Sequence, residues 1–213
     1  MIQRLIQGIL FSFIIVIVPA LGNADAVFAL QLWLMFAIGV FAHLFQPSYK
    51  PFDRSAPTED RNTASQILWS CSLTQVLAIM EAAYLQYPRS FEWDGLAWIS
   101  LIFMLSGLVL RTWAVATLGK FFTWHIKVES HQKIICSGPY RFVRHPSYAG
   151  AMLTYLFGPL FLHAWFSTLV AIVALPLAFR RRIRLEEGLL KRNLGEDYQL
   201  YCRKVKKLIP WIW

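Results

Sequence analysis

The stretch AGAMLTYLFGPLFLHAWFSTLVAIVALPLAF, from Ala149 to Phe179, is apolar apart from breaks at Pro159, His163 and Pro176. A helix crosses a bilayer with about 20 mostly apolar residues, because each residue rises about 1.5 Å and the hydrocarbon core is about 30 Å thick. The stretch is therefore too long for one straight span. It predicts a helical hairpin that turns near His163-Ala164-Trp165.

Four further stretches are apolar enough to cross a membrane, namely Leu5–Pro19, Val27–Phe45, Ala64–Tyr87 and Leu96–Leu118. Hydrophobic residues make up 57% of the 213 residues, whereas soluble domains are about 45–50% apolar. We therefore predict an all-α, polytopic integral membrane protein with about six membrane-crossing helices. The chain divides near Gly119 into N-terminal transmembrane helices, residues 1–118, and a more polar region, residues 119–213, that contains the hairpin and an amphipathic C-terminal tail.

The net charge of +9 is explained most simply by membrane orientation. With Arg4 inside and one crossing per span, every lysine and arginine except Arg89 and Arg111 falls on the inner side or at its edge. This distribution follows the rule that lysine and arginine gather in cytoplasmic loops, so nucleic-acid binding is not needed to explain the charge. We expect a multi-pass protein with cytoplasmic N- and C-termini and no nucleic-acid partner.

The N-terminus and the cysteines set two further expectations. Arg4, the apolar run after it and Ala24-Asp25-Ala26 resemble a signal peptide with a small-residue cleavage site. A retained first helix is the preferred interpretation, because the next span follows at once. The three cysteines and five histidines lack the CxxC, HxxxH and HExxH spacings, so no metal is expected.

Two polar clusters precede the hairpin. Phe121-Phe-Thr-Trp-His125 directly follows a span, and it can equally be an interfacial aromatic belt. The second cluster, GPYRFVRHPSYAG from Gly138 to Gly150, combines turn residues with two arginines whose donors suit carboxylate or phosphate. A helix is expected to begin around Pro146 and to offer free N–H groups to an anion. This cluster can equally be a basic loop that contacts lipid headgroups.

A third cluster, RRRIRLEE from Arg180 to Glu187, follows the hairpin. Arg182 and Glu186 are four positions apart and share one face of a helix. They can form an ordinary surface ion pair. Their position directly after the apolar hairpin favours an Arg–Glu couple at the mouth of a membrane pocket, because charges at membrane depth are costly and tend to be functional. Gly195 is expected to break this helix.

RHPSYAG at 144–150, Glu186-Glu187, GEDYQLY at 195–201 and Pro210, in this order and spacing, resemble the isoprenylcysteine carboxyl methyltransferase family. This family belongs to a wider set of membrane methyltransferases that includes phospholipid methyltransferases. The resemblance covers roughly residues 108–210. It implies S-adenosylmethionine as cofactor, no metal, and an amphiphilic or lipid acceptor such as the carboxylate of a prenylated cysteine.

The resemblance also implies roles for individual residues. Glu186 would bind the cofactor and Arg182 would face the methyl acceptor, which makes them the candidate catalytic pair. The expected cofactor wall comprises His125, Gln132, Lys133, Ile134, Ile135, Tyr140, His145, Pro146, Ser147 and Tyr148. Val128 stands where eukaryotic members of the family carry a glutamine, so a side-chain contact is not implied there.

Two other functions remain open from the sequence. Membrane sterol reductases have a similar C-terminal region with an RHPxY-like motif, but they use NADPH. The Glu186-Glu187 pair and the short spacing from GPYR to RHPSY favour a methyltransferase. The second alternative is a non-catalytic membrane protein that binds lipid through its basic face.

Overall fold

The computed structural model describes residues 1–45, 58–126 and 133–209, and the regular elements in these ranges are all helical. The main helices are α1 (Ile2–Ser12), α3 (Leu30–Phe45), α4 (Thr63–Met80), α5 (Gly95–Leu118), α6 (Pro146–Phe161) and α7 (Trp165–Lys204). Short segments extend or connect them: η1 (Phe13–Ile17), η2 (Val18–Ala20), α2 (Ala24–Val27), η3 (Thr58–Asp60), η4 (Glu81–Leu85), η5 (Arg89–Phe91), η6 (Gly119–Phe121) and η7 (Gly138–Arg141). The predicted all-α architecture is confirmed.

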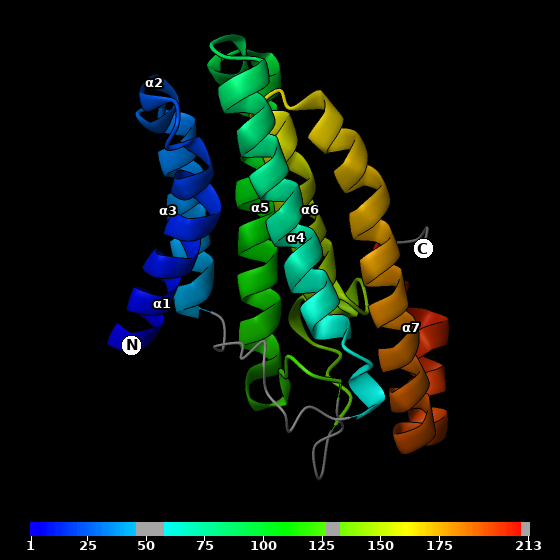
Figure 1. Cartoon of the computed structure of the whole chain (residues 1–213). Helices are drawn as coiled ribbons and strands as arrows, with labels where there is room; N and C mark the ends of the chain where they lie inside the picture. The colour runs from blue at the N-terminus through cyan, green and yellow to red at the C-terminus, as the bar shows by residue number, and fades with distance from the viewer. Residues whose placement is uncertain (46–57, 127–132, 210–213) are drawn as a thin grey trace.

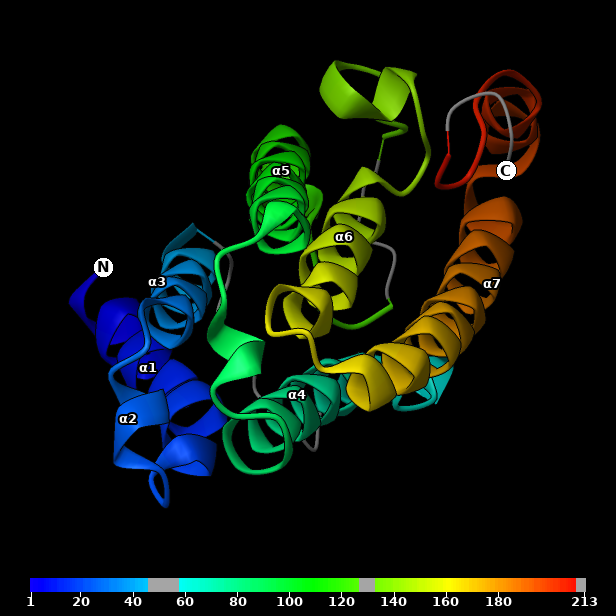
Figure 2. The same cartoon turned by 90° about the horizontal axis from the view of Figure 1, so that it is seen from above.

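The helices stand side by side in an open arc (Figures 1 and 2). The hairpin of α1 and α3 forms one edge, α4, α5 and α6 lie in the middle, and α7 forms the other edge. Fully buried side chains from three of these helices, Leu32, Ile79 and Phe161, belong to one apolar core. Apolar packing therefore joins the N-terminal helices to the region that carries the motifs.

Within the described ranges, three helical stretches are long and apolar enough to cross a membrane: Ile2–Ala20, Thr63–Leu85 and Gly95–Phe121. They coincide with three of the predicted spans. Helices α3 and α6 are apolar but have 16 residues each, fewer than the about 20 that a straight span needs. The chain is thus an integral membrane protein with several apolar helices.

The predicted hairpin is present, and its turn lies where the sequence places it. Helix α6 begins at Pro146 and ends at Phe161, and α7 begins at Trp165. His163 adopts a left-handed backbone with φ of 49° in the turn. Its ring nitrogen Nε2 lies 3.1 Å from a carboxylate oxygen of Asp94, at the start of α5, which ties the turn to the neighbouring helix.

Glu81, a polar interruption in one predicted span, caps the N-terminus of α7. Its carboxylate accepts hydrogen bonds from the backbone N–H groups of Phe166 at 2.9 Å and Ser167 at 2.8 Å, and from the Ser167 hydroxyl at 2.7 Å. The first N–H groups of a helix have no partner within the helix and carry partial positive charge. This buried carboxylate therefore serves as the cap of α7 and does not indicate a separate polar site.

Two glycines let α5 and α6 approach closely. A Cβ atom at Gly107 would lie 2.5 Å from the carbonyl oxygen of Gly150, and one at Gly150 would lie 2.5 Å from that of Gly107. Small residues at such contacts let membrane helices pack backbone to backbone. One helical turn further along α5, Arg111 bonds Ser147 in the first turn of α6. The close packing of α5 and α6 therefore sets the position of the RHPSY motif relative to α5.

Candidate active site

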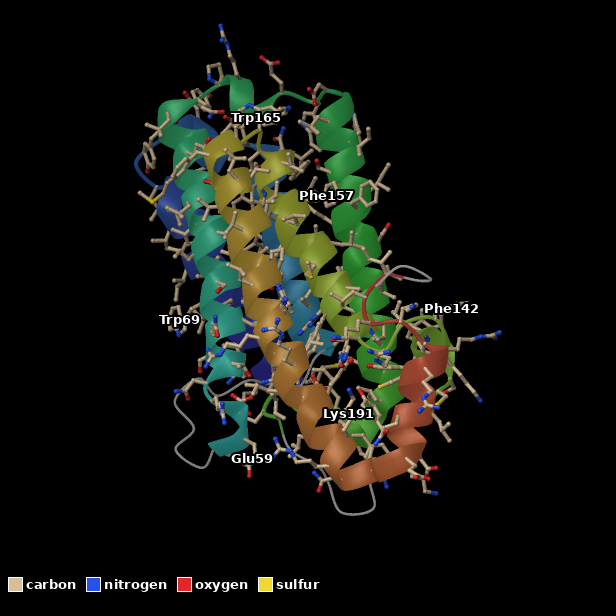
Figure 3. All side chains as sticks on the ribbon, turned by 90° about the vertical axis from the view of Figure 1, so that its right-hand side faces the viewer. Glu59, Trp69, Phe142, Phe157, Trp165 and Lys191 are labelled. Atoms are coloured by element: carbon tan, nitrogen blue, oxygen red, sulfur yellow. The ribbon has the colours of Figure 1, made fainter. Side chains whose placement is uncertain are left out.

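A cavity lies between the start of α6 and the charged part of α7. Figure 3 places Trp165, at the beginning of α7, at one end of the bundle and Glu59 and Lys191 at the other, and the cavity is at the latter end. It holds about 900 Å³ of space free of atoms, part of it open to solvent. The lining residues are Leu118, Phe121, Phe122, Thr123, His125, Ile126, Lys133, Ile134, Ile135, Tyr140, Arg144, His145, Ser147, Tyr148, Arg182, Glu186, Leu189, Leu190, Leu194, Tyr198 and Tyr201.

The cavity brings together most of the residues that the sequence singles out. The two candidate catalytic residues, Arg182 and Glu186, line it, as do eight of the cofactor-wall candidates: His125, Lys133, Ile134, Ile135, Tyr140, His145, Ser147 and Tyr148. Pro146 is buried in the first turn of α6 and does not line the cavity. Gln132 and Val128 lie outside the described residues. The three polar clusters thus form one site.

Tyr148 stands between the two candidate catalytic residues. Its hydroxyl donates to a carboxylate oxygen of Glu186 at 2.6 Å and accepts from Nε of Arg182 at 3.0 Å. The Arg182 side chain is only 4% exposed, so the surface ion pair considered from the sequence is wrong for this residue. Because the tyrosine bridges them, guanidinium and carboxylate are held at a fixed separation along α7.

Asp60 does not line the cavity but holds two residues that do, Arg182 and Ile126, and the sequence did not reveal this role. Its carboxylate accepts from Nη1 of Arg182 and, at 3.0 Å, from the backbone N–H of Ile126 in the cavity wall. His125 Nδ1 lies 3.6 Å from the same carboxylate. Asp60 therefore joins η3, the 124–126 segment and α7. Burial raises the pKa of Asp60, but the Ile126 N–H and the Arg182 charge outweigh it and leave the pKa below the usual value.

The aromatic cluster before the motif belongs to the same wall. The carbonyl oxygen of Trp124 accepts from Nη2 of Arg182, and the guanidinium of Arg111 lies over the Trp124 ring at 5.5 Å. Arg111 also donates to the carbonyl oxygen and the hydroxyl of Ser147, both at 3.1 Å. The arginine inside a predicted span thus connects the aromatic segment to the first turn of α6, and the segment is more than an interfacial belt.

Replacing Asp60 with asparagine is expected to lower the free energy of unfolding by about 1–3 kcal/mol, because a hydrogen bond between charged partners becomes one to a neutral amide. Thr63→Val is the matched control, since the Thr63 hydroxyl bonds the same nitrogen of Arg182 at 3.0 Å without charge. Its expected cost is about 1 kcal/mol. Thermal unfolding of purified variants measures both costs. Equal losses in the two variants would argue against a special role for the Asp60 charge.

Glu187, the second glutamate of the pair, holds the RHP motif in place. Its Oε1 accepts from Nε of Arg144 at 2.9 Å and lies 3.2 Å from Nε2 of His145, while Nζ of Lys207 lies 3.5 Å from Oε2. Arg144 also donates to the carbonyl oxygens of Cys202 and Val205. Its donors are therefore taken by the protein, so Arg144 is a structural part of the motif and is not free for a lipid headgroup.

Residues 201–207 hold the same motif from its other end, and we call these contacts together with those of Glu187 the clamp on the RHP motif, residues 144–146. The backbone N–H groups of Arg144 and His145 donate to the carbonyl oxygens of Lys206 at 2.7 Å and Lys207 at 3.0 Å. The Tyr201 hydroxyl donates to the Tyr140 carbonyl at 2.6 Å. Gly195 makes this return possible, because its φ of 56° and ψ of −132° interrupt α7 in a conformation open mainly to glycine. The predicted break at this position is confirmed.

Comparisons with known proteins agree with this architecture. Residues 99–192 match the model of the isoprenylcysteine carboxyl methyltransferase (ICMT) family. A probable protein-S-isoprenylcysteine O-methyltransferase of Oryza sativa subsp. indica is 30% identical over 151 residues, which cover 70% of this chain and 78% of the relative. Protein-S-isoprenylcysteine O-methyltransferase B of Arabidopsis thaliana is 33% identical over 120 residues, 54% of this chain and 61% of the relative.

The fold itself has a counterpart among solved structures. This chain superimposes on the structure of a eukaryotic intramembrane Ras methyltransferase, an isoprenylcysteine carboxyl methyltransferase, with a TM-score of 0.66. The superposition covers 95% of this chain and 74% of the solved one. The two sequences are 22% identical there, so this likeness concerns the helical arrangement. It extends over the N-terminal helices, for which the sequence offered only hydrophobic spans.

Proposed function

The chain belongs to the isoprenylcysteine carboxyl methyltransferase family, and from this premise we propose that it transfers a methyl group from S-adenosylmethionine to the carboxylate of a prenylated cysteine. It is a membrane methyltransferase, so a methyl donor is required. The named relatives act on protein-linked isoprenylcysteine. The observation that carries the proposal is the cavity in which Glu186, Tyr148 and Arg182 form one hydrogen-bonded chain beside apolar walls.

The chemistry of the cavity fits this donor. Cofactor sites combine apolar walls with a few well-placed polar groups, as this cavity does. Glu186 supplies a partly exposed carboxylate that can pair with a cationic group. The rings of His145 and Tyr148 are stacked, with an angle of 9° between their planes, and offer flat contacts for a purine. Lys133, Ile134 and Ile135 also line the cavity, in agreement with the cofactor contact that the resemblance implies.

S-adenosylmethionine, when bound, supplies a methyl group that is already activated on a sulfonium sulfur, so transfer needs mainly alignment and exclusion of water. Arg182 orients the acceptor carboxylate through a charge-assisted hydrogen bond, while Asp60 and Tyr148 hold the guanidinium. A carboxylate acceptor is ionised at neutral pH and needs no general base. The apolar side chains of Leu189, Leu190 and Leu194 can accommodate a prenyl chain.

The membrane arrangement is part of the same proposal. About six crossings, with both termini in the cytoplasm, place the basic end of α7 and the cavity on the cytoplasmic side, where a soluble donor enters. Residues 119–213 then form the catalytic region and residues 1–118 the N-terminal transmembrane helices. The first region also contributes to the site, because Leu118 lines the cavity and Asp60 bonds Arg182.

Calorimetry on the purified full-length protein tests the donor. We expect S-adenosylmethionine to bind with one site per chain and NADPH to give no heat. Binding of NADPH alone would support a membrane reductase, and binding of neither would support a non-catalytic lipid-binding protein. With the donor established, transfer of labelled methyl groups to a prenylcysteine, compared with phosphatidylethanolamine and small amphiphiles, tests the acceptor. Methylation of the amine lipid alone would contradict the carboxylate assignment.

A further inference from the structure

A second cavity, between α6, α7 and residues 207–208, differs in composition from the active site. It holds about 960 Å³ of space free of atoms, part of it open to solvent, and is lined by Met152, Pro176, Leu177, Arg180, Ile183, Arg184, Lys207 and Leu208. Five of these residues are apolar and three are cationic, and none is acidic. A shallower hollow, lined by Arg61, Leu177, Arg180, Arg181, Arg184 and Leu185, shares the same two arginines and also contains no acid.

Arg180 and Arg184 are available to a ligand. They are four positions apart on α7, so they share one helix face, and both are exposed. Among the residues that the structure describes, neither guanidinium has a hydrogen-bond or ion-pair partner, whereas Arg181 between them is held by Gln66 and by the carbonyl oxygen of Arg61. Planar guanidinium groups match the oxygens of a phosphate.

The position of this cavity along α7 indicates that its ligand is a lipid with an anionic headgroup. Pro176 and Leu177 lie in the last turn of the apolar part of the helix, which ends at Phe179, and Arg180 begins its basic part. In a membrane protein, the change from apolar to basic residues lies at the level of the lipid headgroups. Leu177 is 58% exposed beside the arginines. A free phosphate would use only the cations, whereas a phospholipid would use the cations with its headgroup and the apolar side chains with its acyl chain.

We propose that this cavity, bounded by α6, α7 and residues 207–208, binds an anionic phospholipid of the surrounding membrane, and that the bound headgroup stabilises the clamp on the RHP motif. Lys207 connects the two sites. Its Nζ lies 3.5 Å from Glu187 and its carbonyl oxygen accepts from the N–H of His145 at 3.0 Å. A headgroup that engages Lys207 therefore restrains the segment to which the motif is bonded.

The test compares Arg180→Gln/Arg184→Gln with Arg192→Gln/Arg203→Gln, a control that removes the same charge from exposed α7 arginines outside the cavity. Full-length protein is placed in phosphatidylcholine nanodiscs with and without phosphatidylglycerol, and bound lipid is measured by native mass spectrometry. Each arginine near an anionic membrane surface adds to the attraction for an anionic lipid. The loss of both arginines is therefore expected to weaken the affinity for phosphatidylglycerol roughly thirty-fold. The control should change by less than about three-fold, in line with the weak effect of charges distant from the lipid.

Thermal unfolding supplies a second measurement that needs no methyl transfer, so this inference can fail independently of the proposed function. Phosphatidylglycerol should raise the unfolding temperature of the wild type and of Arg180→Lys/Arg184→Lys, which keeps the charges, but not that of the glutamine variant. In phosphatidylcholine alone all variants should unfold together. Equal phosphatidylglycerol binding by the glutamine variant and the control would overturn the proposal, as would equal stabilisation by inorganic phosphate.

Discussion

Replacing Glu186 with alanine is expected to abolish measurable S-adenosylmethionine binding, and Glu186→Gln is expected to weaken it by roughly ten- to hundred-fold. A hydrogen bond to a charged group contributes about 1.5–3 kcal/mol, which corresponds to that range of affinity. The glutamine keeps the size of the side chain and removes its charge. It therefore separates the attraction between carboxylate and cationic donor from a simple loss of packing. Calorimetry on the purified protein measures the affinity directly.

Glu196→Gln is the matched control for this experiment. It makes the same chemical change on an exposed glutamate of α7 that does not line the cavity. Arg182→Ala provides the contrast within the site: we expect it to impair turnover and to leave donor affinity largely intact, because Arg182 is assigned to the acceptor. Unchanged donor affinity in Glu186→Ala, or an equal loss in Glu196→Gln, would refute the assignment of Glu186.

Local patterns explain why much of the fold was predictable. The hairpin followed from the length of an apolar run, and the start of α6 at Pro146 and the break at Gly195 followed from the backbone preferences of proline and glycine. Each signal is contained in a few neighbouring residues. The motif order also led to the correct family and to about half of the residues that line the cavity.

The partners of the motif residues were not predictable in this way. Asp60 and Arg182 are separated by 122 positions, and Asp60 lies outside the stretch that matches the family model. Nothing near Asp60 distinguishes it from an ordinary acidic residue at the start of a helix. Its role appears only when η3 and α7 are packed together, since a buried guanidinium needs a buried counter-charge.

Glu187 shows a different limit of sequence reasoning. The spacing of four between Arg182 and Glu186 directed attention to one helix face. Successive residues of an α-helix are rotated by about 100°, so the neighbouring Glu187 faces another direction and meets Arg144 and His145. The two adjacent glutamates therefore have separate tasks: one faces the cavity, and the other holds the motif that forms its wall.

Glu187→Gln is expected to reduce the free energy of unfolding by about 3–5 kcal/mol, because removing one partner of a buried ion pair leaves the other charge uncompensated. Glu187 is buried at 5% exposure and faces Arg144, His145 and Lys207. For a chain of this size, each kcal/mol lowers the unfolding temperature by about 2–4 °C, so thermal unfolding should show a fall of roughly 6–20 °C. Asp197→Asn, at an exposed position of the same helix, should leave the temperature nearly unchanged.

The same substitution should remove part of the acid sensitivity of the protein. Burial raises the pKa of Glu187, but the hydrogen bond from His145 and the guanidinium of Arg144 outweigh it and lower the pKa from 4.5 to about 2. Because the folded-state pKa is depressed, the stabilisation is complete above pH 4.5 and is lost as the pH falls toward 2. The gap in stability between wild type and Glu187→Gln should therefore narrow across this window, and a constant gap would contradict the assignment.

A second substitution separates the clamp from a general loss of packing. In Glu187→Gln the buried guanidinium of Arg144 is the main uncompensated charge, so adding Arg144→Gln should recover part of the lost stability, as expected for coupled neighbours. Recovery will be incomplete, because Arg144 also bonds the carbonyl oxygens of Cys202 and Val205. Strictly additive losses in the double variant would mean that the two residues stabilise the protein independently, and the clamp would then have no role in positioning the RHP motif.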